Sequence, residues 1–212
     1  MATIINADTS DGLKFTSDTS GNIDIQSGGS TVCSITSSGL NAAGLTGTLP
    51  AGTNVISAGT AIASTSGTSI DFTSIPSWVK RITVMFNAVS TNGTSLLQIQ
   101  IGDSGGVETS GYNSGAATQA SATLYTANVT TGFVLSVSND GASSSRHGSY
   151  ILSKLDGDNW VGQGNIHESA SYTIGYHCAG SKTLSATLDR VRITTVNGTD
   201  TFDAGSINIL YE

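Results

Sequence analysis

The segment Lys80-Arg81-Ile82-Thr83-Val84-Met85-Phe86, residues 80–86, alternates apolar and polar side chains with a period of two. A β-strand points successive side chains to opposite faces, so Ile82, Val84 and Phe86 would share one face. Such a strand buries its apolar face in a core and turns the other face to water or to a neighbour. The segment therefore predicts a half-buried strand.

The chain from Val55 onward is a succession of similar runs, which are rich in Val, Ile, Thr, Tyr and Phe and bounded by Gly, Asn, Asp or Pro. The predicted strands are 55–63, 69–75, 78–90, 95–102, 118–129, 133–138, 149–155, 160–167, 172–178, 183–196 and 206–211. Apolar residues never recur at helical spacing over three turns. Residues 55–212 are therefore expected to form an antiparallel β-sandwich of jelly-roll type.

Two Asn-Gly pairs predict tight hairpins within this sandwich. Asn92-Gly93 lies between the strand of residues 78–90 and that of residues 95–102. Asn197-Gly198 follows the apolar run of residues 191–196. Asn-Gly suits the two-residue turns of β-hairpins, because both residues tolerate positive φ.

A repeat at a spacing of ten residues occupies the N-terminal region. Its units are Leu13-Lys14-Phe15-Thr16, Ile23-Asp24-Ile25-Gln26 and Cys33-Ser34-Ile35-Thr36, separated by turn sequences that contain Gly and Ser. A strip of three short strands cannot bury its apolar face alone. Positions 13/15, 23/25 and 33/35 are therefore expected to lie against the rest of the chain or against other copies, and Cys33 is interpreted as a small buried hydrophobe.

The domain boundary is predicted after a Gly-rich connector. Gly and Pro interrupt residues 38–54, and the central stretch of residues 44–51 leaves no room for a regular element. Both Trp and all Tyr residues follow this connector, so a large core is available only there. We expect a repetitive β anchor or shaft in residues 1–54 and the sandwich in residues 55–212.

Composition excludes several classes of function. The chain has a net charge of −7 and only 11% charged residues, so it lacks the basic stripe that nucleic acid requires. No apolar run is long enough to span a membrane, and residues 1–10 show no secretory signal. We therefore expect no nucleic-acid partner, no membrane insertion, and folding in the cytoplasm where the chain is made. A disulfide between Cys33 and Cys178 is disfavoured in a reducing compartment.

Catalytic chemistry is weakly represented. Residues 143–147 and 167–169 contain Ser, His and Glu that resemble fragments of a triad, but a chain rich in Ser produces such adjacency by chance. Asp156, Asp158 and Glu168 are the candidates for a pair of glycosidase carboxylates, with solvated turn residues as the competing interpretation.

Ligand-binding motifs are incomplete as well. Residues 156–159 resemble the start of a calcium loop but lack its later Gly and Glu. The three His show no metal-ligand spacing, so a histidine site would need different strands or different chains. Trp78 and Trp160 are candidate sugar platforms, or else core-edge aromatic residues. We predict no catalytic, cofactor or metal residues and a chain that is not an enzyme.

Both ends of the chain carry a resemblance to tail fibres and other small virion structural proteins of tailed bacteriophages. It is carried by Asp8-Thr9-Ser10-Asp11-Gly12-Leu13-Lys14-Phe15-Thr16-Ser17-Asp18-Thr19-Ser20-Gly21, by residues 23–29, by the connector Leu45-Thr46-Gly47-Thr48-Leu49-Pro50-Ala51, and by residues 75–86 and 202–212. The N-terminal part of the resemblance has low complexity and occurs in virion proteins of several positions.

The resemblance implies a homotrimer in which sister chains cover the apolar faces of the N-terminal repeat. It implies a virion structural protein, a short tail fibre that attaches by its N-terminal part to other virion proteins of the tail, baseplate or capsid. The sandwich would bind a host cell-surface glycan or protein through loops 102–115, 139–148 and 156–159, with three copies adding avidity.

Two alternative functions remain open at this stage. A capsid decoration or head-fibre protein would dock its N-terminal strands on the shell and expose the sandwich. A glycan-degrading tail spike is disfavoured, because such enzymes usually need a long β-helical body. Neither the location in the virion nor the identity of the receptor follows from the sequence.

Overall fold

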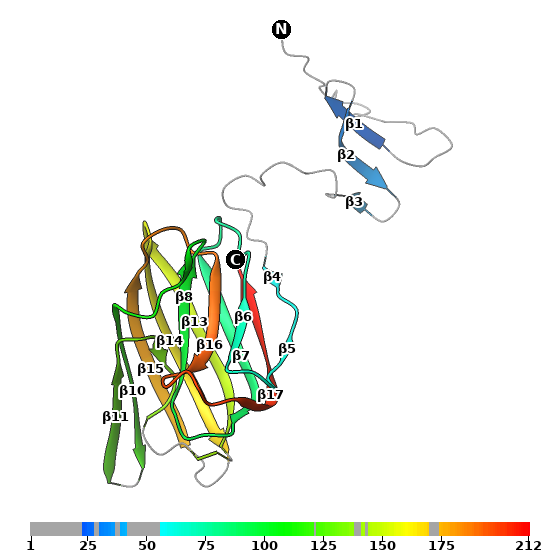
Figure 1. The fold of residues 1–212 in the computed structure, drawn as a ribbon. Coiled ribbons are helices and arrows are strands. Elements are labelled where there is room, and N and C mark those ends of the chain that lie inside the picture. Colours follow the sequence, from blue (N-terminus) through cyan, green and yellow to red (C-terminus); the bar gives the residue numbers. More distant parts are fainter. Residues whose placement is uncertain are drawn as a thin grey trace. The chain divides into compact units, whose positions relative to one another are not determined.

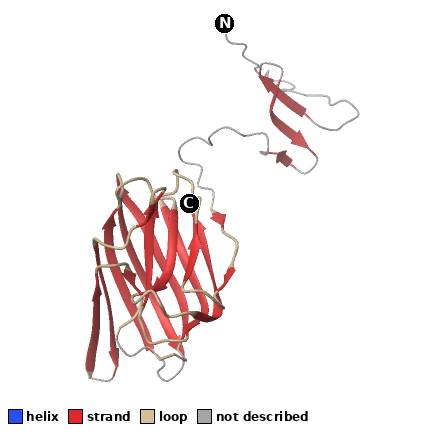
Figure 2. Ribbon diagram, viewed as in Figure 1, coloured by secondary structure: helices blue, strands red, loops and turns tan. Residues whose placement is uncertain are grey.

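The computed structural model describes residues 23–27, 30–36, 39–41, 56–120, 122–137, 141–142, 144–169 and 174–212. The chain divides into two compact units between Asn54 and Val55. Every regular element in the described residues is a β-strand (Figure 2), so the all-β prediction is confirmed. A search of the same residues found no helix that could cross a membrane.

The first unit contains a three-stranded antiparallel sheet of β1 (Ile23–Ser27), β2 (Ser30–Thr36) and β3 (Gly39–Asn41), in that order. Ile23 pairs with Ile35 and Ile25 with Cys33, and the register shifts between Ile25 and Gln26. The strands predicted at 23–26 and 33–36 are therefore present. β3 lies at the start of the predicted connector, before residues 44–51, where no regular element was expected. The first repeat unit, the rest of the connector and the side chain of Cys33 lie outside the described residues.

The second unit is built from two antiparallel sheets (Figure 1). The large sheet has the order β11-β10-β15-β14-β13-β7-β17-β4, and β5 also pairs with β17. Its strands are β4 (Ser57–Ala58), β5 (Ile62–Ala63), β7 (Arg81–Thr91), β10 (Tyr112–Ala120), β11 (Thr123–Val129), β13 (Ser145–Asp156), β14 (Asn159–Ser169), β15 (Ile174–Thr183) and β17 (Phe202–Tyr211).

The small sheet has the order β12-β8-β16-β6, and β9 pairs with β8. Its strands are β6 (Ser69–Phe72), β8 (Leu97–Asp103), β9 (Gly106–Val107), β12 (Phe133–Val134) and β16 (Arg190–Thr195). The chain changes sheet at β5 to β6, β6 to β7, β7 to β8, β9 to β10, β11 to β12, β12 to β13, β15 to β16 and β16 to β17. This is the path of a jelly roll. The three-stranded meander β13-β14-β15 takes the place of a single strand of that fold. The predicted jelly-roll sandwich is confirmed.

The two hairpin predictions are wrong. Asn92-Gly93 connects β7 of the large sheet to β8 of the small sheet, and Asn197-Gly198 connects β16 to β17 in the same manner. The strands that each turn joins do not pair with each other. Asn-Gly supplies the sharp reversal, but whether the reversed chain joins the same sheet depends on partners far away in the sequence.

The hydrophobic core lies between the two sheets. Ile82, Val84 and Phe86 are buried there, as the alternation of residues 80–86 predicts. Phe133 of the small sheet packs against two tyrosines of the large sheet, with ring centroids 5.1 Å from Tyr112 and 5.6 Å from Tyr150. These contacts join segments that are remote in sequence.

Several of the predicted strands have different limits. Residues 118–129 span the turn between β10 and β11, and residues 55–63 contain the two short strands β4 and β5. The strand predicted at residues 183–196 is wrong as a single element, because residues 184–189 form a loop between the end of β15 and β16. The sequence prediction missed most of β10, because Asn113, Gly115 and Ala117 have low strand propensity. Pairing with β11 on one side and β15 on the other holds β10 in place.

Two buried tyrosines make a matched test of this core. The Tyr112 hydroxyl accepts from the Ile101 N–H at 2.8 Å and donates to the Glu108 carbonyl at 2.9 Å. Among the described residues, the Tyr150 hydroxyl has no hydrogen-bond partner. We expect Tyr112→Phe to lower stability by about 1–2 kcal/mol and Tyr150→Phe to leave it unchanged or raise it, in denaturant unfolding. Equal losses in both variants would contradict this packing.

Candidate functional site

The chain enters the second unit at one end of the sandwich. β4 pairs with Leu210 and Tyr211, and the N–H groups of Lys80 and Arg81 donate to the Glu212 carbonyl at 2.7 and 2.8 Å. We call this the proximal end. The opposite end, where β7 and β16 finish and β13 begins, is the distal end (Figure 1).

The three predicted contact loops divide between these ends. Loop 102–115 and turn 156–159 meet at the proximal end, where Ser185 bonds to Glu108 and the Leu184 N–H donates to the Asp158 carbonyl at 3.0 Å. The described part of loop 139–148 precedes β13 or begins it, so it lies at the distal end, twelve strand residues away. One continuous surface of all three loops is therefore not formed within a single chain.

A network of charged and hydroxyl groups fixes the proximal loops. Lys182 is buried and forms an ion pair with Glu108. The Ser185 hydroxyl lies 2.7 Å from Asp103 Oδ2 and 2.8 Å from Glu108 Oε1, and the Ser185 N–H donates to Glu108 at 2.7 Å. The Gly105 N–H donates to Asp103 at 2.7 Å. These contacts connect β8, the loop after it and the end of β15.

The same contacts lower the pKa values of two carboxyl groups. Hydrogen bonds from Ser185 and then from the Gly105 N–H hold the pKa of Asp103 below its ordinary value. Burial alone would raise the pKa of Glu108, but bonds from Lys182 and Ser185 outweigh burial and lower it. Both groups are therefore stabilised as carboxylates, which makes the network a structural clamp.

Asp200 connects the two sheet-crossing turns at the distal end through hydrogen bonds. Its carboxylate accepts from the Ser95 N–H at 2.9 Å and from Asn197 Nδ2 at 2.6 Å. Two further hydrogen bonds of 2.9 Å join the turns: the Asn92 N–H donates to the Thr201 carbonyl, and the Thr201 N–H donates to Asn92 Oδ1. A Cβ atom on Gly93 would lie 2.0 Å from the Asp200 carboxylate, so this close approach requires glycine.

A buried polar cluster anchors the distal loop that precedes β13. Arg146 and Glu168 are cross-strand partners with only 1% and 2% of their surfaces exposed. The Ser144 hydroxyl and the Tyr176 hydroxyl each donate to Glu168, and Arg146 Nη1 donates to the Ser144 carbonyl at 3.0 Å. Buried charges are tolerated only when other groups satisfy them, so these contacts hold Ser144 and the start of β13 to the core.

The candidate carboxylate pair does not form. Asp158 lies in the turn before β14, and Glu168 lies near the other end of that strand. Ten strand residues separate them by about 33 Å, several times the spacing of a glycosidase pair. Glu168 also faces the core, where Ser144 and Tyr176 occupy its oxygens.

Residues 156–159 form a hairpin turn whose polar groups bond to one another. Asn159 Nδ2 donates to Asp156 Oδ1 at 2.6 Å, and the Thr183 hydroxyl donates to Asn159 Oδ1. Gly157 adopts a φ of +44°, which glycine allows. The segment has the geometry of a turn between β13 and β14.

A Ser–His contact exists, but the orientation is wrong for a triad. Ser169 Oγ lies 3.4 Å from His147 Nε2. The Ala88 N–H donates to His147 Nδ1 at 3.3 Å, so that nitrogen cannot donate to an orienting carboxylate in this geometry. Glu168, the adjacent acid, is buried on the opposite face of the sheet.

All three histidines of the chain lie on neighbouring strands of the large sheet. His147 and His167 are directly opposite each other with ring centroids 6.4 Å apart, and His177 pairs with Asn165 on the next strand. No group of three or more His, Cys, Asp or Glu side chains that could hold a metal was found in the described part of the chain. The spacing of the three histidines does not predict this arrangement, because each histidine comes from a different strand.

The remaining aromatic and thiol candidates are accounted for by packing. Trp160 is 2% exposed and belongs to the core, so its interpretation as a sugar platform is wrong. Trp78 is 48% exposed and packs against Tyr211 with ring centroids 5.8 Å apart. Cys178 is a free, buried thiol that donates to the Gly164 carbonyl, and burial raises its pKa to about 12.

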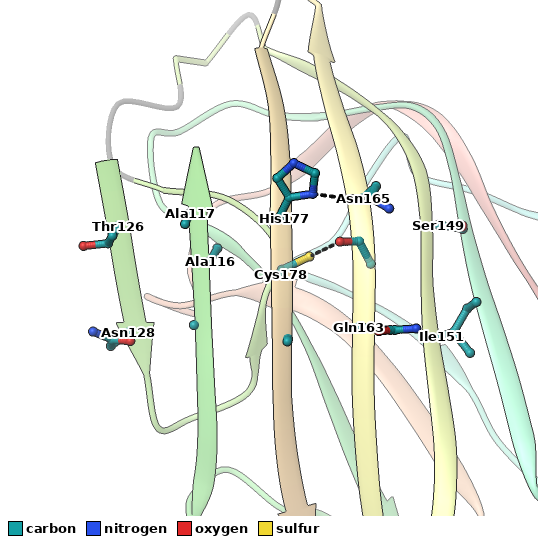
Figure 3. Close-up of a pocket in the computed structure, with 13 residues that line it drawn as sticks. Ala116, Ala117, Thr126, Asn128, Ser149, Ile151, Gln163, Asn165, His177 and Cys178 are labelled. Carbon is teal, nitrogen blue, oxygen red and sulfur yellow. Dashed lines mark hydrogen bonds between the residues drawn. The ribbon is translucent and has the colours of Figure 1, made fainter. Parts of the chain in front are cut away.

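A shallow trough of about 660 Å³ crosses the outward face of the large sheet (Figure 3). Its floor is formed by small residues of β10 and β15, which include Gly115, Ala117 and Ala179. Thr126 and Asn128 of β11 line one side, and Gln163 and Asn165 of β14 line the other. None of the lining residues is charged.

Within this trough His177 is held in place. His177 Nδ1 and Asn165 Oδ1 lie 2.6 Å apart, which fixes the orientation of the ring over the floor. The sequence signal for the trough is the absence of charged residues from Thr109 to Asn139, which contains β10 and β11.

The proximal network predicts a dependence of stability on pH. The pKa values of Asp103 and Glu108 are lowered by folding, so their contribution is full above the ordinary values of 3.8 and 4.5 and is lost as pH falls through the folded values. We expect Ser185→Ala to reduce the loss of Tm between about pH 5 and pH 3. Ser181→Ala, on the outward face of β15, is the matched control and should follow the wild type. An identical pH profile for Ser185→Ala would exclude the network as its source.

Similarity to known proteins assigns no family. Comparison with protein-family models, with curated proteins and with solved structures found no match to this chain. The function is therefore inferred from the chain's own residues and geometry.

Proposed function

We propose that this chain is a virion structural protein, a short tail fibre of a tailed bacteriophage. It forms a homotrimer, attaches to the particle by its N-terminal part and displays a host-receptor-binding β-sandwich. It carries no catalytic site.

The observation that supports this proposal best is the contrast between the two units. One contains a sheet of strands only five, seven and three residues long, too small to bury a core alone. The other is a jelly roll with an extensive core. Jelly rolls are common in viral and carbohydrate-binding proteins, an analogy at the level of fold. The sequence resemblance to phage fibres agrees with this division.

The distal end is the more suitable end for receptor contact. The chain enters the sandwich at the proximal end, so the distal turns around Asn92, Ser144 and Asp200 point away from the point of entry. Hydrogen bonds hold Asn92, Ser144 and Asp200 in place, and a preorganised surface loses less entropy on binding. We therefore favour receptor contact through one of the three predicted loops, 139–148, together with the two sheet-crossing turns.

Sedimentation of the purified full-length chain tests the homotrimer. We expect a species of three times the 21.5 kDa chain. A monomer at micromolar concentration would contradict the proposed fibre.

Location and binding are tested on particles of the phage that encodes the chain. Gold-labelled antibody against the purified chain should mark the tail, and excess purified chain should slow adsorption of particles to host cells. Labelling of the head with unchanged adsorption would favour the capsid decoration protein instead.

A further inference from the structure

Five neighbouring strands of the large sheet present an outward face without charge. On β13, β14 and β15 the odd-numbered residues point outward, as the exposure of Gln163, Asn165 and His177 and the burial of Trp160 and Tyr176 indicate. The outward residues of the five strands are Ser145, His147, Ser149, Ile151, Ser153, Leu155, Asn159, Val161, Gln163, Asn165, His167, Ser169, Gly175, His177, Ala179, Ser181, Thr183, Asn113, Gly115, Ala117, Gln119, Leu124, Thr126 and Asn128. We call this surface the neutral face.

The charged residues of these strands lie off this face or at its proximal margin. Arg146, Glu168 and Lys182 are buried on the inward side of the sheet. Lys154 occupies an inward register position opposite Trp160. Asp156 pairs with Asn159 at the proximal turn, and its carboxylate marks the proximal margin of the face. The small sheet, in contrast, carries the surface ion pair of Arg192 and Asp71.

The neutral face has the size of a protein interface and shares the depletion of charge of an interface centre. Five strands about 4.8 Å apart and about ten residues long cover roughly 24 by 33 Å, or about 800 Å². One side of a standard protein–protein interface buries about the same area. Exposed protein surfaces normally intersperse charges of both signs, whereas interface centres are depleted of them.

The edge next to the neutral face is unprotected. β11 pairs with β10 only, in an unbroken register from Val129 to Thr123. It contains no Lys, Glu, Asp or Pro and no bulge, the usual devices that keep an open strand edge from pairing. Leu124 is 67% exposed on this strand. A covered β11 would explain both features.

The occupant that fits best is a second copy of this chain. Each chain carries a net charge of −7, so two copies repel each other wherever their acidic surfaces meet. A face without charge lets like-charged copies approach and needs no complementary partner. A cyclic trimer joins two different surfaces, and the neutral face and the β11 edge are adjacent and both uncharged.

We propose that the neutral face and the β11 edge form the interface between copies of this chain. The inference rests on the homotrimer of the proposed function and names the surface that joins its sandwiches. The sheet-crossing turns around Asn92 and Asp200, which are proposed for receptor contact, are not part of this surface.

Charge placed on the neutral face tests the interface. Ala117→Glu with Ala179→Glu adds two carboxylates to each trough, on outward positions that leave the core unchanged. Thr60→Glu with Ser66→Glu adds the same charge at exposed sites away from the face and is the matched control. We expect the face variant to lose self-association in sedimentation, with an unfolding transition like that of the wild type, while the control stays assembled.

The histidines report on the face directly, since all three in the chain lie on it. Diethyl pyrocarbonate labels accessible imidazoles, and peptide mass spectrometry locates the label. His167 and His177 should lose reactivity in the assembled full-length chain and regain it in the face variant.

Each failure has a distinct meaning. An assembled wild type with fully reactive His167 and His177 would overturn this interface and leave the homotrimer intact. A monomeric wild type would overturn the homotrimer itself. Reactive histidines in the purified assembly that become protected in intact particles would assign the face to another virion protein and contradict the contact between copies.

Discussion

The structure depends on burying alternate side chains of both sheets in one core. Because both sheets contribute to this core, the chain has to change sheet repeatedly. One result is that Phe133 of β12 packs against Tyr112 of β10 and Tyr150 of β13. Polar contacts gather at the two ends of the sandwich, where the chain reverses direction. Asp200 bonds to the sheet-crossing turns at the distal end, and the clamp around Glu108 lies at the proximal end. Loops that would otherwise be mobile are thereby tied to rigid strands.

Local alternation was enough to predict the strands but not their partners. Residues 80–86 predicted β7 correctly, because each inward side chain is apolar. Asn92-Gly93 predicted a hairpin that does not exist, because the turn residues encode reversal and the sheet is chosen by distant strands. Trp160 was considered for sugar stacking because its flanks are turn-like, yet the register of β14 points it into the core.

The functional surfaces were harder to predict for the same reason. The histidines gather only through the pairing of three strands, and the trough forms on β10, whose small residues argued against a strand. Charged side chains are distributed unevenly over the sandwich. They gather in the buried cluster at Glu168 and in the clamp at Glu108, and they are missing from the neutral face. The charged clusters and the face that we propose for interaction thus occupy different parts of the sandwich. This sorting connects the fold to the proposed trimeric fibre.

We propose that copies of the chain meet through the neutral face. Electron cryomicroscopy of the assembled full-length chain tests this contact, because it shows which surface of each sandwich is covered. We expect three copies, with strands β13, β14, β15, β10 and β11 of each covered by the next copy and the turns around Asn92 and Asp200 free. Sandwiches that stand apart with this face open to solvent, joined only through residues 1–54, would contradict it.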